Sequence, residues 1–387
     1  MKYFSIPSDF KKETIDAYEK LGRRYNDSRV IETYGNITLG NHFESGRTTS
    51  LLPPVDWNHL KEYVEYSRQK GIDFSYTMNG SHMHNQEFTR KGIVEIMNFL
   101  AKLSGAGVRS ITAALPSLME ILRFSGYDMR IKASVICQVT TPNKAAFYKK
   151  MGIDRIVVDE SVNRDFSTLE RIRQAFGDKI EIIVNSICHK DCTYRMFHYN
   201  QIAGDSLETS DETSVNYYNH RCLLRRYELP ANILKLTWVR PEDIKYYTRI
   251  GVRYFKLQGR HTIMKGDPVR AVECYFKESH QGDLLELLDL FAPTTHFRTT
   301  LDNQRLDGFI KPFYEKENFC KNHCANCGYC EDFAGKCIDQ EKNHEIFHRA
   351  EDFYSQYDQF KKILESVNAG SIKSKSKKTL TADFNID

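Results

Sequence analysis

The chain has 387 residues and a formal net charge of +4, from 55 lysines and arginines against 51 aspartates and glutamates. Its hydrophobic content of 41% and charged content of 27% are those of a folded globular protein and exclude a disordered or membrane-embedded chain. No apolar run reaches the ~18–20 residues of a membrane span, and the first residues lack the apolar stretch of a signal peptide, so we expect a cytoplasmic protein.

Short β-branched runs alternate with amphipathic segments of helical period from about residue 29 onward. The predicted strands are Arg29–Asn36, Ile72–Asn79, Val108–Leu115, Arg130–Gln138, Ile153–Glu160, Lys179–Ser186, Ile233–Arg240 and Arg253–Arg260. The helical patterns between and after them include 57–70, 87–104, 143–151, 167–176, 241–250 and 269–278. Gly71, Gly107, Gly152 and Gly251 each stand just before a predicted strand, where a helix end favours glycine with positive φ.

Eight such units over about 250 residues predict an α/β protein with a TIM-like (β/α)8 barrel and a cysteine-rich C-terminal extension. An open doubly wound sheet is the alternative, but it would carry a Gly-rich first turn that this chain lacks. We expect the barrel and an N-terminal segment over 1–281, a cysteine-rich metal-binding segment with a C-terminal helix over 282–368, and a disordered basic tail over 369–387. The tail is either a solvated terminus or a weak arm for RNA or a partner.

Ten cysteines in a chain without an export signal favour metal or redox chemistry over disulfides. Cys188, Cys192 and Cys222 fall in a long connection after the sixth predicted strand, which in a barrel opens on the face that carries active sites. Three thiolates in one loop can hold a [4Fe–4S] cluster, with an open iron or with Cys137 as a fourth ligand. A zinc ion and three uncoordinated cysteines are the alternatives.

A second group of cysteines follows the barrel. Cys320, Cys324, Cys327 and Cys330 are separated by three, two and two residues, and Cys337 comes shortly after them. This spacing predicts a second metal centre, either another [4Fe–4S] cluster or a zinc ion. The first three cysteines also fit the radical S-adenosylmethionine pattern, but such enzymes carry it after the first barrel strand.

His344-Glu345-Ile346-Phe347-His348 matches the H-E-x-x-H pattern of zinc peptidases. Both histidines lie about 160° around the helix from its apolar stripe, at ~100° per residue. We therefore expect them to face solvent rather than to form a catalytic zinc site.

Polar residues gather where several predicted strands end. Arg260, after the eighth predicted strand, offers a guanidinium fork for a carboxylate or phosphate, as loops after strands 7 and 8 of barrels often do. The other polar residues at predicted strand ends are Glu32, Tyr34, Asn36, Asn79, His82, His84, Asp159, Glu160, Asn163, Arg164 and Asp165. As a set they predict a functional rim on this face of the barrel.

The motif VNSICxxxCxxRxxH over residues 184–198 resembles the collagenase-like peptidase family of unassigned catalytic type, the thirty-second such family. Asn-Arg-Asp-Phe at 163–166 and Phe-Lys-Leu-Gln-Gly-Arg at 255–260 add to the resemblance, which covers residues 29 to about 265. The resemblance implies a (β/α)8-like barrel with an oxygen-sensitive [4Fe–4S] cluster on four barrel cysteines. It also implies kinship with oxygen-independent hydroxylases of RNA or ubiquinone precursors, several of which use prephenate as oxygen donor.

The sequence and the resemblance together predict an iron–sulfur barrel enzyme, a hydroxylase or other non-hydrolytic transferase acting on a small molecule or RNA. Arg195, His198 and Arg260 are the predicted catalytic residues, with the two arginines holding an anionic substrate or donor such as prephenate. A peptidase is the first alternative, and a zinc-stabilised scaffold that binds RNA or a partner is the second. The sequence does not identify the electron donor, and it is compatible with a homo- or hetero-oligomer.

Overall fold

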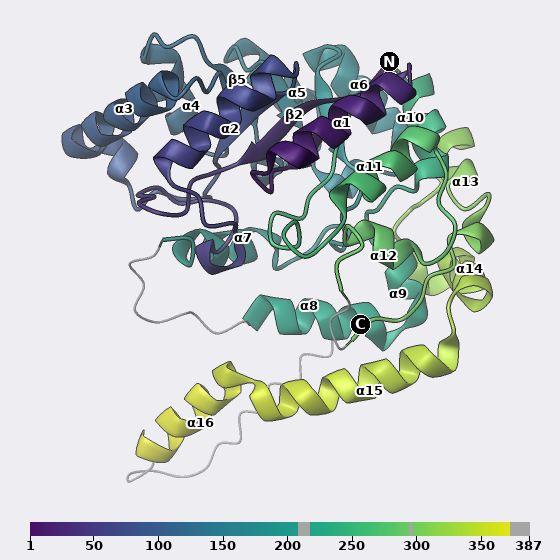
Figure 1. Cartoon of the computed structure of the whole chain (residues 1–387). Coiled ribbons are helices and arrows are strands. Elements are labelled where there is room, and N and C mark those ends of the chain that lie inside the picture. The colour runs from purple at the N-terminus through teal and green to yellow at the C-terminus, as the bar shows by residue number, and fades with distance from the viewer. Residues whose placement is uncertain (208–216, 294–296, 372–387) are drawn as a thin grey trace.

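A computed structural model describes residues 1–207, 217–293 and 297–371, and its centre is a closed barrel of parallel strands ringed by helices (Figure 1). The strands are β1 (Lys2–Pro7), β2 (Ser28–Gly35), β3 (Asp73–Met78), β4 (Ser110–Ala113), β5 (Arg130–Ala133), β6 (Arg155–Val157), β7 (Ile180–Ile183) and β8 (Tyr254–Lys256). They follow one another around the barrel in chain order, and β1 pairs with β8 to close it. The predicted (β/α)8 barrel is confirmed, and the open sheet is excluded.

The predicted number of strands agrees with the structure, but one strand is missing from the prediction and another is wrong. The strand β1 was not predicted, and the strand expected over 233–240 is wrong. That segment begins in the short helix α9 (Pro230–Leu234), whose proline is at the first helical turn, and continues as buried extended chain on the rim. Val239 N there donates to Val184 O at 2.7 Å, beyond the end of β7. The apolar run reflects burial at the rim rather than a place in the barrel.

The helices around the barrel are α1 (Lys12–Arg24), α2 (Trp57–Gln69), α3 (Arg90–Gly105), α4 (Pro116–Phe124), α5 (Pro142–Lys150), α6 (Phe166–Phe176), α10 (Ile244–Arg249) and α11 (Pro268–Lys277). Side chains at helix starts accept backbone N–H groups, as Asp56 does for α2 and Thr89 for α3. The glycines predicted at four helix ends have φ of 73°, 84°, 75° and 85°, which confirms the left-handed conformation expected there. These ends turn the chain directly into β3, β4, β6 and β8.

Charged side chains fill part of the barrel interior. Lys132 of β5 is 2% exposed, and its Nζ contacts Glu32 of β2 and lies 3.0 Å from Glu181 Oε2 of β7. Arg155 Nη1 lies 3.5 Å from Glu181 Oε1, to which Ser5 Oγ of β1 donates at 2.5 Å. Burial alone would raise the pKa of Glu181, but Lys132 and Arg155 lower it to about 2. Glu32, predicted on the rim, therefore belongs to an ion network that joins five strands inside the barrel.

The connection from β7 to β8 carries α7 (Arg195–Gly204), α8 (Tyr217–Glu228) and α9. The C-terminal region adds α12 (Leu284–Leu288), α13 (Lys311–Glu315), α14 (Tyr329–Cys337), α15 (Gln340–Tyr357) and α16 (Gln359–Ser371). The one C-terminal helix predicted within 282–368 is thus two long helices, α15 and α16, which meet at Asp358. In Figure 1, α15 runs alongside α8, and the Asn343 amide of α15 donates to Tyr227 O of α8 at 2.8 Å.

The C-terminal region is fixed to the barrel by a buried stack. The Arg164 guanidinium, just before α6, lies 4.4 Å from the Trp238 ring and 5.0 Å from the Phe309 ring. None of the helices within the described ranges has the length and hydropathy that crossing a bilayer requires. Most of the predicted basic tail, residues 372–387, lies outside the described residues.

The interior ion network predicts a large effect of Lys132→Met. The change leaves Glu32 and Glu181 with less positive charge in a buried site, and we expect a loss of about 3–5 kcal/mol in the free energy of unfolding. Lys70→Met is the matched control, because Lys70 also pairs with two carboxylates, at 2.9 and 3.2 Å, but on the surface. Urea unfolding should show a much smaller loss for it, and equal losses would contradict the role given to the network.

Candidate functional site

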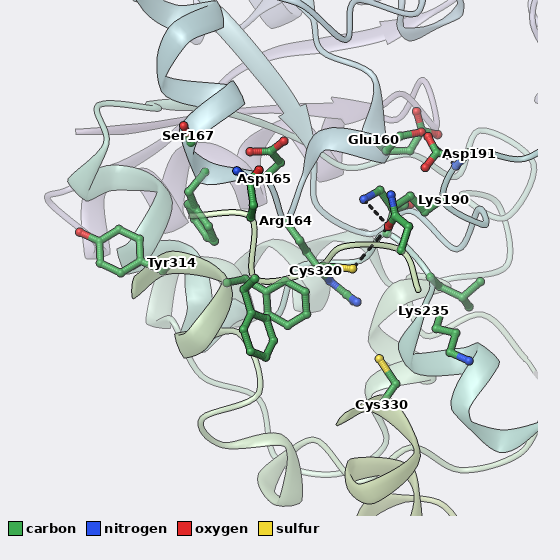
Figure 2. Close-up of a pocket in the computed structure, with 18 of the residues that line it drawn as sticks. Glu160, Arg164, Asp165, Ser167, Lys190, Asp191, Lys235, Tyr314, Cys320 and Cys330 are labelled. Carbon is green, nitrogen blue, oxygen red and sulfur yellow. Dashed lines mark hydrogen bonds between the residues drawn. The ribbon is translucent and has the colours of Figure 1, made fainter. Parts of the chain in front are cut away.

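A cavity of about 780 Å³ opens between the barrel rim and the cysteine-rich segment. Its barrel side is formed by residues that follow β6 and β7, among them Glu160, Arg164 and Lys190, and its far side includes Cys320 and Cys330 (Figure 2). The carboxyl ends of the strands are where barrel enzymes carry their active sites. The extension therefore forms one wall of the candidate site.

The Glu160 carboxyl group is buried at the cavity wall. It is 1% exposed, and its Oε1 accepts a long hydrogen bond of 3.4 Å from Ser186 Oγ. Its Oε2 has no hydrogen-bond partner among the described residues and lies 3.5 Å from Arg195 Nη1. Burial raises the pKa of Glu160, and Arg195 only partly offsets that effect. A carboxyl group with a raised pKa on a cavity wall is a candidate for proton transfer.

Arg195, a predicted catalytic residue, is already engaged within the protein. Its Nη1 lies 2.6 Å from Asp159 Oδ1, and its Nη2 donates to His189 O at 2.8 Å. Although burial opposes the charge of Arg195, Glu160, Cys188 and Asp159 raise its pKa. The side chain is 7% exposed and does not line the cavity, so the structure places it behind Glu160.

Arg260, the second predicted anion-binding arginine, has a different environment. Its guanidinium is 6% exposed and donates to Asn36 Oδ1 at 2.7 Å and Thr77 Oγ1 at 2.8 Å. No carboxylate within the described ranges forms an ion pair with it. Burial and the charge of Arg47 lower the pKa of Arg260 to about 9. A buried guanidinium without a counter-ion is a site for an anion.

His198, the third predicted catalytic residue, lies on α7 and does not line the cavity. Burial, together with Arg47, lowers the pKa of His198 to about 4, so the imidazole is neutral at physiological pH. Its ring centroid lies 6.0 Å from that of Tyr218. The charge of Arg47 lowers the pKa of both Arg260 and His198, so the two predicted residues share one electropositive neighbour.

Two of the barrel cysteines, Cys188 and Cys222, lie near the same guanidinium group. Burial, with Glu160 and Cys222 adding to it, raises the pKa of the Cys188 thiol to about 12. The Arg226 guanidinium interacts with Cys222, whose Sγ lies 4.0 Å from Nη2, and also with Cys188. Cys192 begins the turn into α7, where its carbonyl accepts Arg195 N at 3.1 Å. Such guanidinium groups fit the negative charge of a thiolate-bound cluster.

Cys137, the suggested fourth ligand, faces the core instead. It is 6% exposed, and its thiol donates to Ala114 O at 3.3 Å. Burial raises the pKa of this thiol to about 11.

The C-terminal cysteines divide into two parts. Cys320, Cys324 and Cys330 line the cavity, whereas Cys327, which is exposed like Cys320 and Cys324, does not. The charges of Cys320 and Cys330 favour a raised pKa of Arg164, and those of Cys324 and Cys330 favour a raised pKa of Lys235. This is the positive surrounding that a set of thiolates needs.

Cys337 lies apart from that set. It ends α14, seven residues and about 10 Å along the helix axis from Cys330. Its thiol donates to Phe333 O at 2.9 Å, and burial raises its pKa to about 12.

The H-E-x-x-H segment lies on α15, and both His344 and His348 are exposed, as predicted. The buried side of that helix is formed by Asn343, Ile346 and Ala350.

Sequence reasoning missed the group formed by Glu44, His82 and His84. The two histidines were noted at a strand end, but Glu44 lies in the preceding loop, 38 residues earlier, and no motif links them. Only the convergence of the two loops brings these side chains together. Within the described residues, no other set of three histidine, cysteine or acidic side chains has ligand atoms that all lie within 4.8 Å of one another.

Comparison with known proteins gives a consistent family. The family model described as "Peptidase family U32" matches residues 53–279. The uncharacterized protease MJ1657 of Methanocaldococcus jannaschii is 32% identical over 342 residues, which cover 87% of this chain and 98% of that protein. The solved structure of the U32 peptidase Mk0906 matches with a TM-score of 0.48 at 18% identity, over 67% of this chain and 93% of that one.

These comparisons correct the predicted reaction. The expectation of an iron–sulfur hydroxylase is wrong, because the matching family and the relative over nearly the whole chain are both named for proteolysis. The peptidase alternative is the better supported one. The error has a chemical reason: cysteine spacing indicates a metal centre but does not specify the reaction near it.

The ion pair behind Glu160 predicts the consequence of Arg195→Met. The change leaves Asp159, which is 2% exposed, without its cation, and we expect the free energy of unfolding to fall by about 3–5 kcal/mol. Arg47→Met is the control, because Arg47 forms no ion pair with a carboxylate in the described part of the chain. Chemical denaturation should show a clearly smaller loss for the control. An undiminished stability of Arg195→Met would mean that the pair is not structural.

Proposed function

Since the chain belongs to peptidase family U32, we propose that it hydrolyses peptide bonds in the cavity between the barrel and the cysteine-rich segment. The observation that carries this proposal is Glu160. Its carboxyl is buried, has a raised pKa, has one oxygen without a hydrogen-bond partner and lies on the cavity wall. These are the properties of a general base at an active site.

In the proposed reaction the Glu160 carboxylate removes a proton from a water molecule. The water oxygen forms a bond to the peptide carbonyl carbon, and the carbonyl oxygen becomes negatively charged. The protonated Glu160 then returns the proton to the leaving nitrogen as the C–N bond breaks, which gives a carboxylic acid and an amine. The acid transfers its remaining proton to the amine, so that a carboxylate and an ammonium group are released.

Arg164 is suited to stabilise the negative charge that develops on the carbonyl oxygen. It lines the cavity, and Figure 2 shows its side chain extending toward the cysteine segment. Its Nη1 and Nη2 donate to Leu234 O and Trp238 O, so Nε is the nitrogen left without a partner among the described residues, and burial lowers the pKa of Arg164. A cation held in a water-poor site stabilises such a charge more strongly than one in bulk water.

Of the two arginines predicted to bind an anion, Arg260 is the one that we propose does so. Arg195 is neutralised by Asp159 and Glu160, whereas Arg260 is buried with neutral partners. Arg260 does not line the cavity, so an anion bound there would lie outside the proposed site of hydrolysis. The cytoplasm remains the proposed location, because all ten cysteines are free and a reducing compartment keeps them so.

Two metal centres are part of the proposal as cofactors. Cys188, Cys192 and Cys222 would hold a [4Fe–4S] cluster by three ligands, and Cys320, Cys324, Cys327 and Cys330 would hold a second cluster or a zinc ion. The support is the charge of Arg226 near Cys188 and Cys222, and of Arg164 and Lys235 near Cys320, Cys324 and Cys330. When bound, the second centre would brace the cavity wall opposite Glu160.

Glu160→Gln should reduce the turnover of a peptide library by about 100-fold or more, because the amide cannot accept the proton. In the parent protein, turnover should rise with pH through a pKa above the ordinary glutamate range, since burial raises the pKa of Glu160. Asp243→Asn is the control, because it removes another buried carboxylate, 3.0 Å from Arg240 and outside the cavity. The proposal fails if Glu160→Gln keeps its turnover, or if both variants lose it equally.

Replacing both Cys324 and Cys327 by Ser should remove one metal centre and leave the other. The spacing of the C-terminal cysteines is local, so one short loop can wrap a metal without distant strands. Iron, sulfide and zinc should be quantified on anaerobically purified protein, with a Cys274→Ser variant as control for loss of a cysteine outside both sets. If both centres disappear together, the two sets form a single site.

A further inference from the structure

A second candidate site lies on the rim, formed by Glu44, His82 and His84, none of which lines the cavity. Their ligand atoms, one from each side chain, all lie within 4.8 Å of one another. We propose that these three residues bind a divalent transition-metal cation of the zinc class. This inference does not depend on the proposed peptide hydrolysis.

The fold brings the three side chains together at the carboxyl ends of two neighbouring strands. Glu44 lies in the loop after β2, and the histidines lie in the loop after β3. The loops meet where Gly80 N donates to Glu44 O at 3.3 Å. A Cβ at Gly80 would lie 2.6 Å from Glu44 Cβ, so only glycine permits this approach. The contact holds the carboxylate close to the histidines.

The Glu44 carboxylate is buried without compensation. The residue is 2% exposed, and neither carboxylate oxygen has a hydrogen-bond partner in the described part of the chain. His84 Nε2, at 3.6 Å from Oε1, is beyond hydrogen-bond distance. Glu87 is also buried, and its charge acts unfavourably on Glu44. A buried anion of this kind needs a cation, because an unpaired ionised carboxylate is strongly disfavoured inside a protein.

His82 is oriented as a metal ligand would be. Its Nε2 lies 3.2 Å from Asn200 O of α7, and because a carbonyl only accepts, the proton must be on Nε2. The lone pair is then on Nδ1, which is buried and has no partner among the described residues. A backbone carbonyl that fixes the second nitrogen of a ligating histidine is a regular feature of metal sites.

His84 provides the exposed side of the site. Its side chain is 64% exposed, and its ring centroid lies 4.5 Å from that of His82. His84 and Asn85 have φ of 48° and 62°, two successive non-glycine residues in the left-handed region. Such strain is found where a local function holds the backbone in place. Three protein ligands with one at the surface leave a coordination position open to solvent, as in catalytic zinc sites.

The donor set indicates the class of metal. Two imidazole nitrogens and one carboxylate oxygen suit zinc, cobalt and related ions, whereas magnesium and calcium prefer oxygen ligands alone. Tetrahedral bonds of 2.0–2.1 Å place ligand atoms about 3.3 Å apart. The three atoms therefore need only a small closing movement to coordinate one ion.

The alternative is a simple ion pair between protonated His84 and Glu44. The Glu44→Gln variant distinguishes a metal site from an ion pair, because it keeps the shape of the side chain and removes its buried charge. If the site binds metal, the metal-free variant should melt above the metal-free parent, and zinc should raise the melting temperature of the parent but not of the variant. An ion pair alone predicts a lower melting temperature for Glu44→Gln and the same response to zinc in both proteins.

Cobalt titration of the full chain, after chelator treatment and under reducing anaerobic conditions, gives the second measurement. His84→Gln changes an exposed side chain and should fold normally, and it should bind one cobalt equivalent fewer than the parent. His344→Gln is the matched control, because it removes an exposed histidine from another pair, whose Nε2 atoms lie 3.1 Å apart. Equal cobalt binding by the parent and His84→Gln, or the same loss in His344→Gln, would overturn the proposal.

Discussion

The ion network inside the barrel is the constraint on which the rest of the structure depends. Lys132 lies between Glu32 and Glu181, and Arg155 and Ser5 complete the network. Charged side chains in a barrel core are costly unless they are paired, so the network favours the arrangement of strands that brings these groups together. The positions of the loops that follow those strands depend on this alignment.

Buried charges on the rim are also expected to have partners of opposite charge, and the exceptions indicate candidate ligand sites. Arg195 and Asp159 neutralise each other, as the interior charges do. Arg260 lacks a carboxylate partner within the described residues, and Glu44 there lacks any hydrogen-bond partner for its two oxygens. These are the two rim charges for which we propose ligands, an anion at Arg260 and a cation at Glu44.

The C-terminal extension is part of the candidate active site rather than an appendage. Arg164, Trp238 and Phe309 join it to the barrel through one buried stack, and the cysteine segment then faces Glu160 across the cavity. Glu160 is 1% exposed, and the extension completes the cavity on whose wall it lies.

The sequence by itself determined the barrel, its four glycine turns, the exposure of His344 and His348, and the family, because periodicity, turn chemistry and motifs are local properties. It placed the strand at 233–240 wrongly and missed β1, since an apolar run shows burial but not pairing partners. Only the tertiary structure decided that Arg195 is neutralised, that Cys137 faces the core, and that Glu44 meets His82. Those outcomes depend on which loops converge above the barrel, and convergence follows from strand order and register rather than from spacing along the chain.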